Sequence, residues 1–83
     1  MAKITVYTAD NCPYCHKAKL LLADRGVPYT EMKIGWDDEA QWDALYGRSK
    51  MKTVPQIFAD DKLVGGYSEL AELDKKDSLK SLR

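Results

Sequence analysis

The chain has few of the residues that usually crosslink a small protein or hold a metal in it. Its 83 residues include only two cysteines and one histidine. Cys12 and Cys15 are separated by two residues, and a disulfide that closes so short a loop removes little entropy from the unfolded chain. The two cysteines therefore cannot serve as a structural crosslink, and we expect their role to be chemical.

Charge of one sign and long apolar segments are also lacking. Thirteen Lys and Arg residues balance thirteen Asp and Glu residues, and the longest run of one sign is the acidic segment 37–39. Because such a surface creates no strong field, we expect neither nucleic acid nor a membrane as a partner. No apolar run approaches the ~18 residues of a membrane span, and residues 1–4 carry no signal-peptide pattern, so we expect a cytoplasmic protein.

The length suits one hydrophobic core and leaves no room for a second module. Hydrophobic residues make up 45% of the chain and charged residues 31%, which is typical of a folded protein rather than a disordered one. The sequence contains no linker, repeat or low-complexity segment. We therefore expect a single domain over residues 1–83 that is monomeric.

The first part of the chain predicts a strand, a helix and a second strand. Residues 3–8 alternate in β-branched and aromatic side chains, as a strand does. Pro13 can occupy the first turn of a helix that ends at Gly26. Residues 29–34 predict the second strand. Such a unit indicates parallel pairing through a right-handed crossover.

The second part predicts a helix, a hairpin and a third helix. Asp37 or Asp38 caps a helix that extends to about Gly47. Segments 56–59 and 62–64 flank two aspartates, the spacing of an antiparallel hairpin. A third helix should run from residue 67 or 68 to about 73, and segment 77–82 should form a short terminal helix. The expected class is α/β with the order β-α-β-α-β-β-α.

The motif Cys12-Pro13-Tyr14-Cys15 lies between the first strand and the first helix. This position places Cys12 at the amino end of the helix and Cys15 one turn inside it. Free backbone N–H groups and the helix dipole stabilise a thiolate at that end. We therefore predict that Cys12 attacks and that Cys15 resolves the resulting disulfide.

Two other interpretations of this motif are zinc binding and haem attachment. A zinc site needs about four ligands, and beyond the two cysteines the chain offers only His16 and carboxylates. Cys12 to His16 also matches the attachment motif of c-type haem, which normally requires export, and the chain has no export signal. We therefore expect no metal site and no bound haem, and favour redox chemistry.

Two further motifs could bring backbone groups to the cysteines. Thr53-Val54-Pro55 precedes the third strand, where proline fits either as a cis residue that aims the Val54 backbone at a ligand or as a simple trans strand start. The double glycine before Tyr67 and Ser68 fits either a close approach to a ligand carboxylate or a plain turn. The residues alone leave both pairs of alternatives open, although we expect Ser68 to cap the third helix.

In combination, the Cys12–Cys15 motif, the segment Thr53–Phe58 and the double glycine followed by Tyr67 resemble the dithiol glutaredoxins over nearly the whole chain. The resemblance implies a thioredoxin-like fold with a four-stranded mixed sheet flanked by helices. It also implies reduction of protein disulfides and of protein–glutathione mixed disulfides, with glutathione as co-substrate and no permanently bound cofactor.

The same resemblance implies a set of glutathione-binding residues. They are Tyr14, Thr53, Val54, Pro55, Gly66, Tyr67 and Ser68. The Val54 backbone would pair with the cysteinyl part of glutathione, and the residues after the double glycine would hold its γ-glutamyl end. Ala9 and Trp42 stand where family members usually carry polar residues for the glycyl carboxylate. Nearby cations that could replace them are Arg48, Lys50 and Lys52.

Two alternative functions stay open at this stage. One is a redoxin that a flavoprotein reductase recharges and that donates electrons to an enzyme such as ribonucleotide reductase. The other is an iron–sulfur carrier in which Cys12 of two chains and two glutathiones bind a cluster. Pro13 argues against the carrier, because cluster-binding relatives mostly have a less rigid residue there.

Overall fold

The computed structural model describes residues 3–82. Its elements follow the predicted order β-α-β-α-β-β-α and end in a short 3₁₀ turn. They are β1 (Ile4–Thr8), α1 (Pro13–Asp24), β2 (Thr30–Lys33), α2 (Glu39–Ser49), β3 (Gln56–Ala59), β4 (Lys62–Gly65), α3 (Tyr67–Asp77) and η1 (Lys80–Leu82).

The four strands form one mixed sheet in the order β2-β1-β3-β4. β1 pairs in parallel with β2, as the strand-helix-strand pattern predicts, and antiparallel with β3. β3 and β4 form the predicted hairpin, with Ala59 opposite Lys62. The sheet therefore confirms the thioredoxin-like fold.

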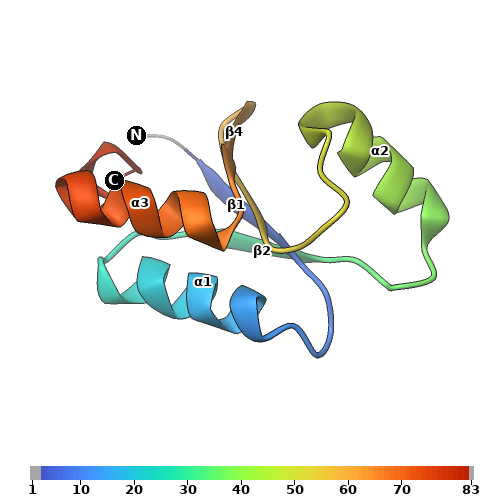
Figure 1. The fold of residues 1–83 in the computed structure, drawn as a ribbon, viewed down its shortest axis with the longest axis horizontal. Coiled ribbons are helices and arrows are strands. Elements are labelled where there is room, and N and C mark those ends of the chain that lie inside the picture. Colours follow the sequence, from blue (N-terminus) through green and yellow to red (C-terminus); the bar gives the residue numbers. More distant parts are fainter. Residues whose placement is uncertain (1–2, 83) are drawn as a thin grey trace.

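Helices cover the two faces of the sheet unequally, with α1 and α3 side by side and α2 apart from them (Figure 1). The larger apolar cluster joins the sheet to α1 and α3 and contains Ile4, Val6, Ala18, Leu22, Val27, Ile57, Leu70, Leu79 and Leu82. The smaller cluster, under α2, contains Ile34, Leu45 and Phe58. Because successive side chains of a strand point to opposite faces, Ile57 and Phe58 belong to different clusters.

Two helices are longer than the sequence predicts. Gly47 lies inside α2 rather than at its end, and the helix continues until Lys50 adopts a left-handed φ of 59°. In this added segment Ser49 is buried and donates a hydrogen bond to the Leu45 carbonyl.

The end of the chain also differs from the prediction. α3 extends to Asp77 instead of about residue 73. Ser78 and Leu79 then have positive φ values, so the expected helix over 77–82 is reduced to the 3₁₀ turn. Burial of Leu79 and Leu82 in the main core holds this segment in place without a regular helix.

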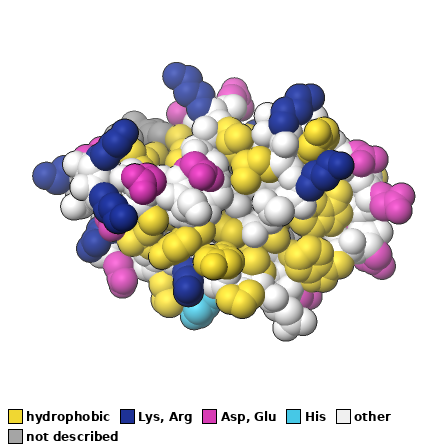
Figure 2. Space-filling view, viewed as in Figure 1, with side chains coloured by type: hydrophobic (Ala, Val, Ile, Leu, Met, Phe, Trp, Pro, Cys, Tyr) yellow, Lys and Arg dark blue, Asp and Glu magenta, His cyan; other side chains and the backbone are white. Residues whose placement is uncertain are grey.

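On the face drawn in Figure 2, basic and acidic side chains are mixed around a central apolar area, and no large patch of one charge sign is visible. Among residues 3–82, no helix combines the length and the apolar character that a membrane crossing requires.

Candidate active site

Cys12 is the N-cap residue of α1 and has an extended backbone, with φ −114° and ψ 102°. Its Sγ accepts a hydrogen bond from the backbone N–H of Cys15 at 3.3 Å. Pro13 occupies the first turn, where its missing N–H leaves no helical bond unmade. The sulfur therefore takes the place that a hydroxyl or carboxylate oxygen has in an ordinary cap.

The loop before β3 approaches the same sulfur. The peptide bond between Val54 and Pro55 is cis, which decides between the two conformations that the sequence left open. The Cys12 thiol lies 3.6 Å from the Val54 carbonyl oxygen and donates a hydrogen bond to it. Residues 42 positions apart in the chain thus meet at the reactive sulfur.

The second cysteine is in a different environment. Cys15 is 2% exposed, whereas Cys12 is partly exposed. Burial raises the pKa of the Cys15 thiol to about 12, and its hydrogen bond with Cys12 acts in the same direction. Cys15 is therefore a thiol in the reduced protein, and only Cys12 can meet a substrate directly.

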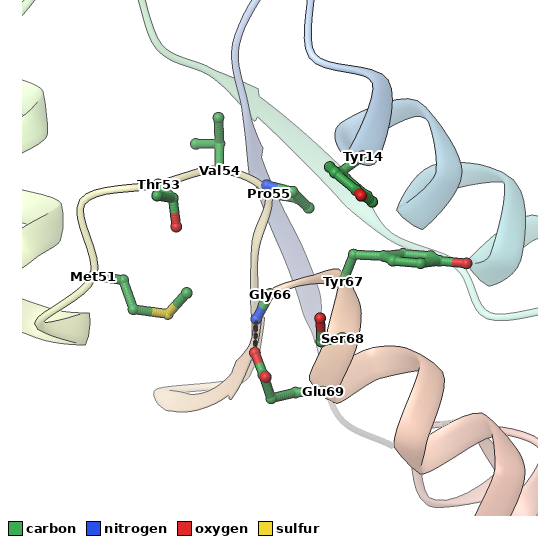
Figure 3. A pocket seen from close by; sticks show the side chains of 9 residues that line it. All are labelled: Tyr14, Met51, Thr53, Val54, Pro55, Gly66, Tyr67, Ser68 and Glu69. Carbon is green, nitrogen blue, oxygen red and sulfur yellow. Dashed lines mark hydrogen bonds between the residues drawn. The ribbon is translucent and has the colours of Figure 1, made fainter.

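A groove of about 350 Å³ lies between the 51–55 loop, the first turn of α1 and the start of α3 (Figure 3). It is lined by Tyr14, Met51, Thr53, Val54, Pro55, Gly66, Tyr67, Ser68 and Glu69. All seven residues that the resemblance implied for glutathione binding are in this set. Met51 and Glu69 complete it, and the sequence analysis did not single out Met51.

An aromatic pair joins the two helices at the groove. The rings of Tyr14 and Tyr67 are 5.8 Å apart at an angle of 36°. The Nζ atom of Lys17 lies 5.1 Å from the centre of the Tyr14 ring. Tyr14 remains 57% exposed, so its ring is available to a ligand at the mouth of the groove.

The start of α3 corrects one prediction. Gly66, and not Ser68, is the N-cap residue, and Ser68 is the second residue of the helix. The Glu69 carboxylate accepts a hydrogen bond from the Gly66 N–H at 2.7 Å. A glutamate three residues after the cap supports a helix start in this way, so the sequence did contain a signal for it.

The preceding residue, Gly65, has a φ of +130°, a value that side chains rarely tolerate. A Cβ atom there would come within 2.6 Å of Glu69 Cγ. Glycine at this position therefore permits both the turn after β4 and the folded-back position of Glu69.

Two buried polar side chains hold the 51–55 loop. Gln56 is fully buried, and its Nε2 donates to the carbonyl oxygens of Met51 and Thr53 at 3.1 and 2.8 Å. Ser49 Oγ accepts from the Met51 N–H at 3.0 Å. The sequence analysis missed both residues, because nothing local marks a strand glutamine or a serine in the last turn of a helix as buried.

The residues at the expected glycyl-carboxylate positions lie outside the groove lining. Ala9 is buried, and Trp42 stacks on Trp36 with ring centres 5.7 Å apart. Arg48 lies over Phe58 and donates to the Tyr7 hydroxyl at 2.9 Å. Lys50 and Lys52 both lie over the ring of Tyr46.

Among the described residues 3–82, no group of three or more His, Cys, Asp or Glu side chains is arranged to hold a metal ion.

Comparisons with known proteins agree with this geometry. A family model described as Glutaredoxin matches residues 4–64. Glutaredoxin 3 of Escherichia coli is 42% identical over 82 residues, which cover 99% of this chain and 98% of that protein. A probable glutaredoxin of Synechocystis is 44% identical over 82 residues, which cover 98% of this chain and 74% of that protein.

Solved structures give the same result. The solution structure of a glutaredoxin from Brucella melitensis has a TM-score of 0.84 and 35% identity, covering 99% of this chain and 88% of that one. A buckwheat glutaredoxin–glutathione complex has a TM-score of 0.86 and 25% identity, and the match covers 98% of this chain and 76% of that one. The chain therefore belongs to the glutaredoxin family of glutathione-dependent thiol–disulfide oxidoreductases, with Cys12 and Cys15 as its active-site pair.

Proposed function

We propose that Cys12 is the nucleophile, that Cys15 is the resolving thiol and that glutathione binds along the groove of Figure 3. One observation carries the proposal. The partly exposed Cys12 sulfur caps α1 and lies 3.6 Å from the Val54 carbonyl at the groove, while Cys15 is buried behind it. A substrate disulfide can reach the first sulfur and not the second.

Reduction of a protein–glutathione mixed disulfide needs only Cys12. Its thiolate attacks the glutathione sulfur, the bond between that sulfur and the protein breaks, and the protein leaves as a thiolate that takes up a proton. A second glutathione thiolate then attacks the glutathione held on Cys12. This step releases oxidised glutathione and regenerates the Cys12 thiolate.

Reduction of a protein disulfide also needs Cys15. Cys12 first forms a mixed disulfide with the substrate, and Cys15 then gives up its proton and attacks the Cys12 sulfur. The substrate leaves as a dithiol, and two glutathiones reduce the resulting Cys12–Cys15 disulfide. The high pKa of Cys15 supports this order, because a buried thiol that keeps its proton does not compete for the first attack.

The groove offers suitable partners for glutathione. The Val54 backbone can pair with the extended tripeptide as a neighbouring strand does. The start of α3 presents free N–H groups at residues such as Ser68, which suit the γ-glutamyl carboxylate. The solved buckwheat relative is a complex with glutathione, and its similarity in fold supports the same ligand here.

The protein substrates that we propose are disulfide-containing and glutathionylated proteins of the cytoplasm. The glutathione of that compartment keeps cysteine pairs reduced and would supply the electrons for this reaction.

A coupled assay tests the electron donor. With NADPH, glutathione and glutathione reductase, the protein should reduce a glutathionylated peptide, whereas thioredoxin reductase in place of the glutathione system should give no turnover. Turnover with thioredoxin reductase alone would contradict glutathione as the co-substrate.

A substitution at Ser68 tests the binding site. Proline in the first turn of a helix is tolerated, so Ser68→Pro should keep α3 and remove the N–H that faces the ligand. We expect the KM for the glutathionylated peptide to rise while the rate of Cys12 alkylation by iodoacetamide stays unchanged. Ser68→Ala keeps the N–H and is the control. An unchanged KM in a folded Ser68→Pro protein would place glutathione elsewhere.

A further inference from the structure

Gln56 is the most deeply buried polar side chain near the groove, although it does not line it. Its exposed fraction is 0%, and both of its hydrogen bonds go to carbonyl oxygens of the loop before β3. The partners are Met51 and Thr53, at 3.1 and 2.8 Å from Nε2. One side-chain amide thus bridges two points of a segment that has no regular secondary structure.

The amide oxygen of Gln56, in contrast to its nitrogen, makes no hydrogen bond among the described residues, and this oxygen is buried. A buried acceptor without a partner is unfavourable, and an apolar side chain of equal length would avoid it. The two N–H donors are therefore the groups that this position requires.

The bridged segment forms one side of the groove. Met51, Thr53, Val54 and Pro55 all line it, and the Val54 carbonyl meets the Cys12 thiol. In Figure 3 the side chain of Val54 points to the opposite side from that of Thr53, so the backbone of Val54 borders the site. The orientation of that backbone depends on the carbonyls that Gln56 holds on either side of Lys52.

We propose that Gln56 is a positioning residue for glutathione binding: its amide holds the Met51 and Thr53 carbonyls so that the Val54 backbone faces a ligand on Cys12. This inference rests on the proposed function of the groove. It predicts that the loss of Gln56 weakens binding of a glutathionyl group and leaves the intrinsic reaction of Cys12 intact.

The decisive variant is Gln56→Met, which keeps the length of the side chain and removes its donors. We expect the KM for a glutathionylated peptide to rise about tenfold, which corresponds to the loss of about one neutral hydrogen bond between the displaced Val54 backbone and the ligand. The rate with 2-hydroxyethyl disulfide and dithiothreitol, which need no peptide-binding groove, should stay within about twofold. Gln56→Asn keeps both donors on a shorter side chain and should recover part of the affinity.

Gln41→Met is the matched control, because Gln41 is an exposed glutamine of α2 whose Nε2 bonds Asp38 away from the groove. Its KM should equal that of the unmodified protein. If Gln56→Met fails to fold, Gln56→Leu replaces it, since a shorter apolar side chain also lacks donors and brings no charge into the buried site. Amide hydrogen exchange provides a second measurement, with faster exchange expected at Val54 and unchanged exchange in β1.

An unchanged KM in a folded Gln56→Met or Gln56→Leu protein would overturn the inference. Equal losses with the glutathionylated peptide and with 2-hydroxyethyl disulfide would also overturn it, because they would indicate a general structural defect. Failure of the unmodified protein to turn over the glutathionylated peptide is a different result and would contradict the proposed function itself.

Discussion

The starts of α1 and α3 both border the groove, but different atoms satisfy their backbone N–H groups. At α1 the acceptor is the sulfur of Cys12, which receives the Cys15 N–H. At α3 the N-cap is Gly66, which has no side chain, and the Glu69 carboxylate folds back onto the Gly66 N–H.

The acceptor at the start of α1 is the reactive group itself, whereas the acceptor at the start of α3 only stabilises the helix. At α1 the capping atom is also the reactive atom, so the local field that stabilises the helix start acts directly on the sulfur. At α3 the Glu69 carboxylate accepts the hydrogen bond of the Gly66 N–H and so fixes the turn, and the N–H groups of the first helical turn stay available for a ligand. Substitutions at α1 should therefore change the reaction, whereas those around α3 should change stability or binding first.

The largest effect is expected for Cys12→Ser. Serine is a good N-cap residue, so the free energy of unfolding should change by less than about 1 kcal/mol. Disulfide exchange should fall to the background rate, because a hydroxyl does not replace the thiolate. Urea denaturation and the coupled glutathione assay measure the two quantities.

Cys15→Ser is the comparison variant for this prediction. It should retain turnover of glutathionylated peptide, since that reaction uses one protein thiol, and lose the reduction of protein disulfides. Similar losses of glutathionylated-peptide turnover in both variants would show that the assignment of roles is wrong.

Gly65→Ala should give the largest change in stability. The φ of +130° and the 2.6 Å approach of a Cβ to Glu69 both oppose any side chain. A strained backbone position of this kind costs roughly 1 to 3 kcal/mol, which urea denaturation would detect.

The control for that variant is Gly47→Ala, inside α2, where nothing lies within 4 Å of an added Cβ. It should stabilise the protein by roughly 0.5 to 1 kcal/mol through helix propensity. Destabilisation of equal size in both variants would mean that the turn before α3 has no special requirement.

Glu69→Ala should have an intermediate effect. Removing the carboxylate leaves the Gly66 N–H without its acceptor, and the loss of a helix-start bond costs about 0.5 to 2 kcal/mol. Glu69→Gln keeps an oxygen in the same place and should stay close to the unmodified protein. If thermal unfolding shows the two variants to be equal, the bond from Glu69 does not support α3.

The smallest effect is expected at the ion pair between Arg25, the C-cap of α1, and Asp74 of α3, with Nε 2.6 Å from Oδ1. The Arg25 hydrogen bond holds the pKa of Asp74 below its usual value. The pair therefore contributes stability above the unfolded pKa of an aspartate, and this contribution disappears as the pH falls through the lowered pKa of Asp74.

Asp74→Asn should consequently lower the urea midpoint slightly at neutral pH and not at strongly acidic pH. High salt should reduce the difference at neutral pH, because the pair is exposed. A difference that persists unchanged in acid would indicate that the pair does not act through charge.

Local patterns in the sequence predicted most of the fold. Alternation in residues 3–8 and the two-aspartate hairpin depend on neighbours in the chain, and the structure confirms both. The errors lie at the ends of helices: α2 passes Gly47 and ends at the buried Ser49, and α3 passes residue 73, where Asp74 pairs with the distant Arg25. Gly47 and the polar residues after Leu73 predicted helix ends, but both helices continue beyond these positions.

The residues of the groove can also be divided into those that the sequence predicted and those that it did not. Its seven expected residues were implied by the resemblance to dithiol glutaredoxins, which rests on three short motifs. Met51 has no local mark, since a methionine between two lysines resembles any surface loop. Ser68 was expected to cap α3, although Glu69 already stood at the spacing of a supporting glutamate.

By itself, the sequence determined that Cys12 starts a helix and that Cys15 lies one turn inside it, because strand alternation, Pro13 and helical spacing are local properties. Only the tertiary structure decided that the Val54 carbonyl meets the Cys12 sulfur and that Gln56 holds the loop which carries it. Those contacts depend on β1 and β3 pairing side by side and on which side chains this pairing buries. Burial depends on the whole packed chain, so no local pattern specifies it.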